Sequence, residues 1–288
     1  MTDFAWLSAL DDPSLIRAIE DLYVAGAPEP DLEALCRSLA GRGLALSVPG
    51  GTVRVDLGDW TSIVMIRLRA WEPHLSGLAM ALVRPGDFVV DVGAHVGTWT
   101  LLLGSLVGER GQVVAFEPYG PSAARARDAV LAAGHGDRAR VVEAAVGERA
   151  GRAPLYAGTD SMLHSLVLGT GHVTDVPVTT LDELGPRAVR FLKIDTEGLE
   201  LAVLRGGRAL LAGCDPSLLI ELHAEQLVAQ GSSSAEVFAE LRAQGFVVFD
   251  LRPEGFDLHV EPLLDERAPT THHVLARRDP SPFVVSLR

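Results

Sequence analysis

Acidic residues and a histidine stand at the ends of two apolar segments and indicate the chemistry that the chain supports. One segment leads to Asp195 and Glu197, and a later one leads to Glu221 and His223. If both segments form neighbouring parallel strands, their carboxyl ends converge on one crevice. Carboxylates and an imidazole gathered there can accept the proton of a hydroxyl group or hold a divalent cation. We therefore predict Asp195, Glu221 and His223 as catalytic residues.

A metal ion is one way to assist such chemistry. The hard oxygen ligands Asp195 and Glu221 favour Mg²⁺, and His223 is then a third ligand or the general base. The structural alternative is that Glu197 and Glu221 cap helices or bind backbone amides, and that His223 is a partly buried histidine. Both interpretations stay open on the sequence alone. Four other histidines have no spacing that marks a metal site and are predicted to be ordinary residues: His172, His259, His272 and His273.

A glycine loop follows an earlier apolar segment. Residues 87–92 lead through Asp91 into Gly93 and Gly97, and a second apolar run follows at residues 100–103. A buried strand, a glycine turn and a helix in this order build a nucleotide site at the carboxyl edge of a doubly wound sheet. Glycine lets the backbone pass close under the ligand, where a side chain would collide.

The acid at the strand end selects the nucleotide. The loop reads D-x-G-x-x-x-G instead of the dinucleotide pattern G-x-G-x-x-G, and the Asp91 carboxylate would repel a pyrophosphate but suits the ammonium group of S-adenosylmethionine. Glu117 ends the next apolar run and can accept both ribose hydroxyls, although NAD sites use such an acid too. Glu72 would close over the methionine ammonium, or else it is a solvated acid before a proline. The residues predicted to bind the methyl donor are Glu72, Asp91, Gly93, Ala94, His95, Gly97, Thr98, Glu117, Pro118, Glu143, Ala144 and Asp195.

Composition limits the partners and the compartment. The chain has 288 residues and a formal net charge of −13, which argues against an electrostatic grip on a nucleic-acid backbone, so no nucleic-acid partner is expected. No apolar stretch reaches the roughly 20 residues that span a bilayer, and the first residues do not read as a signal peptide. We therefore expect a cytoplasmic protein without membrane contact, in which Cys36 and Cys214 are free thiols.

The periodicity of apolar residues predicts an α/β protein with an N-terminal cap. Residues 1–42 have helical spacing, and alternation then predicts short strands at residues 44–46, 53–57 and 63–66. We divide the chain into a cap, residues 1–70, and a nucleotide-binding domain, residues 71–288. The cap, with Trp60, Met65 and Trp71, is expected to cover the cleft and to shape the acceptor pocket or a homodimer contact.

Alternating strands and helices from about residue 75 onward predict a mainly parallel sheet with helices on both faces. The remaining segments are predicted to be loops, a helix cap and further strands. Residues 157–171 are predicted to form a loop near the adenosine or the acceptor, or else a plain surface loop, and Ser232-Ser233-Ser234 is predicted to cap a helix. Further strands are predicted at residues 112–116, 139–146, 189–195 and 217–223, and residues 245–251 and 271–276 would close the sheet as a hairpin around a loop at residues 252–269.

Six short motifs resemble one known family. Between about residues 65 and 250 the chain carries, in the expected order, Trp71-Glu72-Pro73, Pro85-Gly86-Asp87, Asp91-Val92-Gly93-Ala94-His95-Val96-Gly97, Phe116-Glu117-Pro118, Leu192-Lys193-Ile194-Asp195-Thr196-Glu197-Gly198 and Ile220-Glu221-Leu222-His223. These resemble the motifs of the FkbM-type, S-adenosylmethionine-dependent methyltransferases, which commonly have Asn at the position of His95 and Tyr at that of Trp99. The resemblance implies a class I methyltransferase fold, with a mostly parallel seven-stranded sheet, and methylation of a hydroxyl on a sugar, a polyketide or another secondary metabolite.

The sequence thus predicts an O-methyltransferase that uses S-adenosylmethionine, with Mg²⁺ as an optional aid, on a small-molecule acceptor. Asp195 is expected to lie close to the reacting oxygen. In some small-molecule O-methyltransferases of similar fold, acids at the ends of the corresponding strands hold such an ion, which is an analogy of fold alone. The alternatives are an N-methyltransferase, a donor-binding module without catalysis and, less favoured, a dehydrogenase.

Overall fold

A large mixed sheet forms the centre of the molecule. The computed structural model describes residues 10–24, 29–58, 62, 64–66, 72–157, 171–263, 269 and 271–286. Within them the sheet has the order β14-β12-β11-β13-β10-β9-β3-β4-β5. Its strands are β3 (Phe88–Val92), β4 (Gln112–Phe116), β5 (Ala139–Val142), β9 (Val189–Ile194), β10 (Ser217–Glu221), β11 (Val247–Glu254), β12 (Asp257–Pro262), β13 (His273–Arg277) and β14 (Phe283–Ser286).

The strands that carry the predicted motifs are parallel. β5, β4, β3, β9 and β10 pair in parallel, whereas β13, β11, β12 and β14 are joined by antiparallel pairings. The ends of β3, β4, β9 and β10 therefore lie along one edge of the sheet, as the sequence predicts. The α/β class is confirmed, but the predicted seven strands are nine in the described residues.

Of the two additional strands, β12 lies where a loop was predicted and β14 follows the last predicted strand. Residues 252–269 contain the end of β11 and all of β12, which form a hairpin around Gly255 (φ 63°). Pro253 lies within β11 opposite Leu258. Because a proline usually argues against a strand, the sequence does not indicate that β11 continues through this position. β13 then inserts between β10 and β11 instead of pairing with β11 alone.

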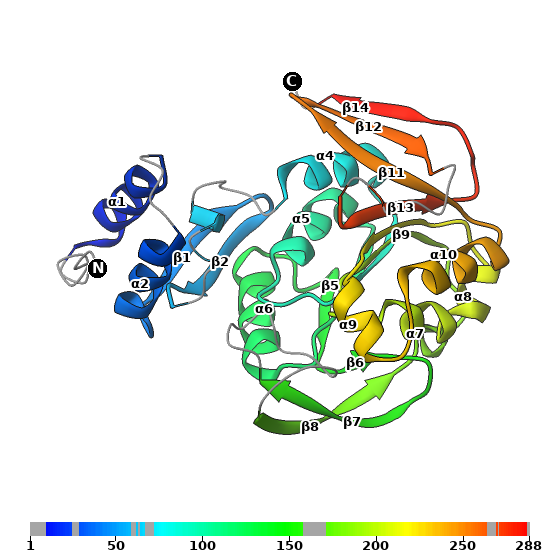
Figure 1. Cartoon of the computed structure of the whole chain (residues 1–288), viewed down its shortest axis with the longest axis horizontal. Helices are drawn as coiled ribbons and strands as arrows, with labels where there is room; N and C mark the ends of the chain where they lie inside the picture. The colour runs from blue at the N-terminus through cyan, green and yellow to red at the C-terminus, as the bar shows by residue number, and fades with distance from the viewer. Residues whose placement is uncertain are drawn as a thin grey trace.

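Helices cover both faces of the sheet (Figure 1). On one face lie α4 (Pro73–Leu82), α5 (Thr98–Val107) and α6 (Gly120–Ala132), and on the other α7 (Glu200–Arg205), α8 (Arg208–Ala212), α9 (Ala224–Ala229) and α10 (Ser234–Ala243). Neighbouring strand residues alternate between the two cores: Phe191 packs with the first set and Leu192 with the second. This is the two-sided burial that parallel strands require. As predicted, the serine segment caps a helix, since Ser233 accepts the Glu236 N–H at the start of α10.

The N-terminal region packs on the outside of α5 and α6. It comprises α1 (Asp12–Val24), α2 (Glu29–Leu39) and the hairpin of β1 (Gly43–Val48) and β2 (Gly51–Asp56), and lies at the left of Figure 1. At the hairpin turn, a Cβ on Gly50 (φ 90°) would lie 2.2 Å from the Leu101 carbonyl oxygen. The His135 Nε2 lies 3.0 Å from the Gly50 carbonyl oxygen, and Arg138 lies 2.6 Å from His135 Nδ1. The hairpin is thus fixed to the helices and not to the carboxyl edge of the sheet.

Two further predictions about the cap can be compared with the described residues. Residues 64–66, predicted as part of a strand, are helical. Met65 is buried in the hydrophobic core. Trp60 and Trp71 lie outside the described residues, as do residues 158–170 of the predicted loop.

A small second sheet borders the carboxyl edge. The predicted strand at residues 139–146 is interrupted at Glu143 and Ala144, so that β5 ends and β6 (Ala145–Val146) begins in another sheet. β6 pairs with β8 (Gly171–Thr179), which pairs with β7 (Gly151–Ala157), and a short 3₁₀ helix, η3 (Leu181–Leu184), follows. Figure 1 shows this sheet below the central one.

Candidate functional site

The loop after β3 passes directly against the end of β9. Gly93 has φ 88°, and a Cβ there would lie 1.7 Å from the carbonyl oxygen of Asp195. Gly97, with φ 93°, packs on Ala126 of α6, where a Cβ would have 3.0 Å to the nearest carbon. Both glycines are therefore required by the contacts that place the loop, as well as by their backbone angles.

Glu117, at the end of β4, fixes the same loop from its other side. Its Oε2 accepts the backbone N–H of His95 and its Oε1 accepts that of Tyr119, each at 2.8 Å. A carboxylate has about four acceptor positions, so two remain for the ribose hydroxyls that the sequence assigns to it. Burial raises the pKa of Glu117 to about 7, although both backbone hydrogen bonds oppose the shift.

A pocket opens at this edge of the sheet and encloses about 660 Å³, open solvent included. Six predicted donor-binding residues line it: Gly93, His95, Glu117, Pro118, Ala144 and Asp195. Its lining also includes the apolar side chains of Val146 in β6 and Leu155 in β7, together with Thr196 and Glu197. None of the residues described between 10 and 66 lines it, and the predicted cover of the cleft by the cap stays a prediction.

The other predicted donor-binding residues lie around the pocket and not in its wall. Asp91 is fully buried beneath the loop, where its Oδ2 accepts the Thr100 hydroxyl at 2.7 Å and its Oδ1 has no hydrogen-bond partner within the described residues. Burial raises the pKa of Asp91. Glu143 is exposed and binds Arg127 at 3.0 Å. Ala94, Gly97 and Thr98 belong to the loop and the start of α5, and Glu72 precedes α4.

Asp195 is anchored by a lysine from its own strand. The Lys193 Nζ donates a 2.7 Å hydrogen bond to Asp195 Oδ2, and the two side chains are only 4% and 13% exposed. Burial by itself would raise the pKa of Asp195, but the Lys193 ammonium and the neighbouring His223 hold it below its ordinary value. Burial would likewise lower the pKa of Lys193, yet the carboxylates of Asp195 and Asp91 raise it.

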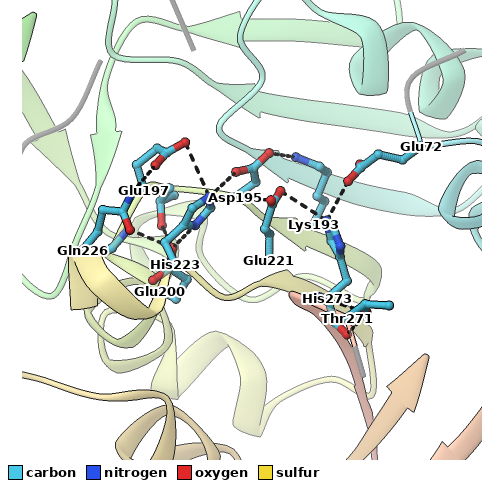
Figure 2. A network of polar contacts seen from close by, with 12 residues as sticks. Glu72, Lys193, Asp195, Glu197, Glu200, Glu221, His223, Gln226, Thr271 and His273 are labelled. Carbon is cyan, nitrogen blue, oxygen red and sulfur yellow. Dashed lines mark hydrogen bonds and ion pairs between the residues drawn. The ribbon is translucent and has the colours of Figure 1, made fainter. Parts of the chain in front are cut away.

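His223 stands at the centre of several carboxylates (Figure 2). Its Nδ1 lies 3.0 Å from Glu200 Oε1, and its Nε2 lies 3.4 Å from Glu197, 3.7 Å from Glu221 and 3.8 Å from Asp195. Burial alone would lower the pKa of His223, but its contact with Glu200 and the other carboxylates raise the pKa to about 9. The same crowding acts on Glu197, whose pKa rises to about 7, mainly through burial.

Glu221 also belongs to a second group on the far side of Lys193. The His273 Nε2 lies 2.6 Å from Glu72 Oε1 and 3.2 Å from Glu221 Oε2, and Trp99 Nε1 donates to Glu72 Oε2 at 3.1 Å. Burial opposes protonation of His273, but the two carboxylates raise its pKa to about 10. Figure 2 shows both groups on either side of the Lys193 and Asp195 pair.

Backbone strain gathers at this edge as well. In the described residues, three non-glycine residues have positive φ: Glu72 (50°), His95 (49°) and Glu197 (52°). Such angles are uncommon outside glycine, and they persist where surrounding contacts hold them. All three residues line the pocket or belong to the clusters of carboxylates around His223 and His273. The departure from the family pattern at position 95 is explained here, because Asn and His both tolerate this region.

Three residues of the site escaped prediction from the sequence. Lys193 and Glu200 lie close to predicted residues, but for Glu200 nothing in the spacing indicates that its side chain turns inward. His273 was predicted to be an ordinary residue, since its partners, Glu72 and Glu221, are remote in the chain. The motif Leu192-Lys193-Ile194-Asp195 carried a signal for Lys193: a lysine at an inward-facing position of a buried strand needs a carboxylate partner.

Sequence comparison with protein families decides the identification. The family described as Methyltransferase FkbM domain matches residues 91–248, which is more than half of the chain. The chain belongs to the FkbM methyltransferase family. This FkbM protein is thus a member of a family of S-adenosylmethionine-dependent methyltransferases, as the resemblance of its motifs implies. No curated protein matches it in sequence.

Solved structures similar to this FkbM protein include several methyltransferases. An S-adenosylmethionine-dependent O-methyltransferase from Thermotoga maritima has 16% identity and a TM-score of 0.45, with 82% of this chain and 85% of that chain covered. Methyltransferase FkbM from Methylobacillus flagellatus has 17% identity and a TM-score of 0.42, with 86% and 58% covered. An rRNA methylase from Streptococcus thermophilus has 15% identity and a TM-score of 0.37, with 75% and 96% covered.

One prediction is corrected by this comparison. The net charge of −13 led us to exclude nucleic acid as a partner. Because an rRNA methylase is among the similar structures, that exclusion is wrong. The net charge of a whole chain averages over all its faces and does not decide what one cleft binds.

Among the described residues, every helix is too short or too polar to cross a bilayer. The cytoplasmic location stays a prediction.

The residues present fit the methyl donor of this family. A Cβ on Gly93 would fill the space in which the loop meets Asp195, and the Glu117 carboxylate is held by backbone amides with acceptor positions to spare. The apolar wall of Ala144, Val146 and Leu155 suits a flat base. The fit therefore rests on shape, on hydrogen-bond acceptors and on an acidic surrounding that matches a sulfonium.

Proposed function

We propose that this FkbM protein transfers the methyl group of S-adenosylmethionine to a hydroxyl group of a small molecule such as a sugar, a polyketide or another secondary metabolite. The observation that carries this proposal is that Asp195 and Glu197 line the pocket assigned to the donor, with His223 Nε2 3.8 Å from Asp195 and 3.4 Å from Glu197. A hydroxyl must lose its proton to attack, whereas a neutral amine does not, so the proton-accepting carboxylates of Asp195 and Glu197 in this pocket favour an oxygen acceptor.

The donor contributes a methyl carbon on a sulfonium; the new oxygen–carbon bond forms as the carbon–sulfur bond breaks, and the electron pair stays on sulfur. The protein's part is to position and to remove a proton. Gly93, His95 and Glu117 hold the donor side, and the carboxylates of Asp195 and Glu197, with His223 beside them, receive the hydroxyl proton. Holding the acceptor oxygen roughly 3 Å from the methyl carbon supplies much of the rate.

Lys193 contributes to this arrangement without reaching the acceptor. Its ammonium occupies Asp195 Oδ2, so Oδ1 is the oxygen that faces His223, at 3.8 Å. The two residues then present a carboxylate oxygen and an imidazole nitrogen side by side. An acceptor hydroxyl that enters from the rim would meet both.

The test is a panel of matched acceptors that differ by one group, such as polyols and the corresponding amino-polyols, with release of S-adenosylhomocysteine and the mass of the product as readouts. An RNA oligonucleotide belongs in the panel, because an rRNA methylase is among the similar structures. We expect hydroxyl acceptors to be methylated and His223→Gln to lower kcat by about 10²-fold to 10⁴-fold with donor affinity retained.

The matched control is His259→Gln, a histidine in an exposed ion pair with Glu254 on the β11–β12 hairpin, which should leave kcat unchanged. Methylation of amines alone, at a rate insensitive to His223→Gln, would identify an N-methyltransferase and refute the proposal. Tight donor binding with no product across the panel would identify a donor-binding module without catalysis.

A further inference from the structure

We propose that Asp195, Glu197 and His223 form a binding site for a divalent first-row transition-metal ion such as Mn²⁺. The ligand atoms of these three side chains lie within 4.8 Å of one another. All three side chains are between 13% and 17% exposed, so they are sheltered, and Asp195 and Glu197 line the pocket. The role of the ion in the reaction rests on the proposed function above, whereas the binding of the ion does not.

The spacing of the atoms suits a common ion. The His223 Nε2 lies 3.4 Å from Glu197 Oε1 and 3.8 Å from Asp195 Oδ1. Ligands held ~2.1 Å from one metal ion lie roughly 3.0–3.4 Å from each other, depending on the coordination angle. Small rotations of the side chains would therefore close the group around an ion.

An independent observation is the buried acid behind the histidine. Glu200 is fully buried, its Oε1 faces His223 Nδ1 at 3.0 Å, and its Oε2 has no hydrogen-bond partner within the described residues. A histidine that binds a metal through one nitrogen characteristically gives its other N–H to a carboxylate, which fixes the tautomer and the ring. Glu200 thus orients His223 so that Nε2, the free ligand position, faces Asp195 and Glu197.

The charge around the group also calls for a cation. The carboxylates of Glu72, Asp195, Glu197, Glu200 and Glu221 surround Lys193, His223 and His273, and so the acids outnumber the bases. A divalent ion bound by Asp195, Glu197 and His223 would neutralise part of this negative charge.

The donor set selects the type of ion. Mg²⁺ prefers oxygen ligands alone, whereas imidazole suits first-row transition metals, and Mn²⁺ accepts both kinds of ligand. The sequence-based expectation paired Asp195 with Glu221, but Glu221 lies in the other group, with Glu72 and His273. We therefore expect Mn²⁺ to bind more tightly than Mg²⁺.

The position next to the donor pocket gives the ion a use. Asp195 and Glu197 line the pocket that we assign to the donor, so an ion on these residues would lie beside an acceptor that reaches the methyl group. A divalent cation lowers the pKa of a hydroxyl bound beside it, which supplies the activation that an alcohol needs.

The experiment is a titration of the chelator-treated full-length protein with MnCl₂, followed by the electron paramagnetic resonance signal of free Mn²⁺. We expect one ion per chain at micromolar affinity, and at least tenfold weaker competition by Mg²⁺. Glu200→Gln should weaken binding about 10-fold to 100-fold, as is usual for residues that orient a ligand. His223→Ala should weaken it at least as much, and His259→Ala should not change it. S-adenosylhomocysteine affinity checks that each variant is folded.

Three results would overturn the proposal: no Mn²⁺ binding to the wild type, loss of binding in His273→Ala with His223→Ala unaffected, or tighter binding of Mg²⁺ than of Mn²⁺. If His223→Ala does not fold, Glu197→Gln, which keeps its size, takes its place with the same expectation. Mn²⁺ binding without methylation of any acceptor would support the metal site and contradict the proposed function. Methylation that persists without Mn²⁺ binding would do the reverse.

Discussion

The Lys193 ammonium and the Asp195 carboxylate form a nearly buried ion pair, with 2.7 Å between Nζ and Oδ2. They lie two residues apart, so both side chains leave the same face at the end of β9, next to the loop that carries Gly93. The pair explains how a lysine is accommodated within a parallel strand whose neighbours are Phe191 and Leu192. It also links the stability of the sheet edge to the carboxylate that we place beside the acceptor.

We predict that Lys193→Met destabilises the protein by about 3–5 kcal/mol, because it leaves buried carboxylates without their cation. The measurement is the free energy of unfolding in urea. Arg190→Met is the matched control, since Arg190 is an exposed cation on the same strand and its loss should change stability by no more than about 0.5 kcal/mol. Equal effects of the two substitutions would mean that the ion pair contributes nothing specific.

The contact between Gly93 and Asp195 predicts a second outcome. In Gly93→Ala the new Cβ would meet the Asp195 carbonyl oxygen at 1.7 Å, so the loop has to move away from β9. We expect affinity for S-adenosylhomocysteine to fall at least tenfold in a calorimetric titration. Gly86→Ala separates this contact from backbone strain, because Gly86 also has positive φ (95°) but no atom within 4 Å of the added Cβ.

Gly86→Ala should therefore lower stability by about 1–2 kcal/mol, the ordinary cost of a left-handed alanine, and leave donor affinity unchanged. A loss of affinity in Gly86→Ala as large as that in Gly93→Ala would show that general destabilisation, and not the close approach to β9, controls the donor pocket.

Which residues meet at the pocket could be predicted from the sequence better than which residues join Lys193, His223 and His273, for a physical reason. Gly93, Glu117 and Asp195 each stand at the end of a parallel strand, and the rule that such ends share one edge brings them together. The loop composition then indicates what they bind. These features are local in the chain, so the periodicity and spacing of residues in the sequence indicate them.

The second group, Glu72, Glu221 and His273, and the contact between Glu200 and His223 both join residues from different elements, and no local sequence pattern indicates such contacts. His273 reaches Glu221 because β13 inserts antiparallel to β10, with these two residues in register. Glu72 joins them from a segment that precedes α4, and Glu200 turns toward His223 from the first residue of α7. Pro253 and the charged residues around it likewise concealed β12, one of the two strands by which the sheet exceeds the predicted seven. The antiparallel side of the sheet is thus where the prediction failed.

Glu117 makes donor binding dependent on pH. Its pKa of about 7 in the free protein should fall when ribose hydroxyls donate to the carboxylate, because such hydrogen bonds favour the charged form. Affinity for S-adenosylhomocysteine should then be level above pH 7 and fall by up to about tenfold per pH unit below it, with a proton released on binding at acid pH. Calorimetry in two buffers of different ionisation enthalpy measures both quantities.

In Glu117→Gln the affinity should be lower, and this part of its pH dependence should be absent. Glu197 titrates in the same range and also lines the pocket, so the difference between wild type and Glu117→Gln, and not the wild-type profile alone, is the decisive quantity. Glu109→Gln removes an exposed acid remote from the pocket and should keep the wild-type profile. An unchanged slope in Glu117→Gln would rule out ribose binding by this carboxylate.

The strained backbone at His95 gives the last prediction. Its φ of 49° directs the His95 N–H to Glu117 Oε2, so the loop geometry depends on a residue that tolerates the left-handed region. His95→Ala should destabilise the protein by about 1 kcal/mol, His95→Asn should have little effect, and His95→Gly should equal or exceed the wild type in stability. Urea unfolding of the three variants measures this order. Equal stability of the alanine and glycine variants would show that the left-handed conformation is not what selects the residue here; the order expected above would explain why this chain can carry histidine where its family commonly has asparagine.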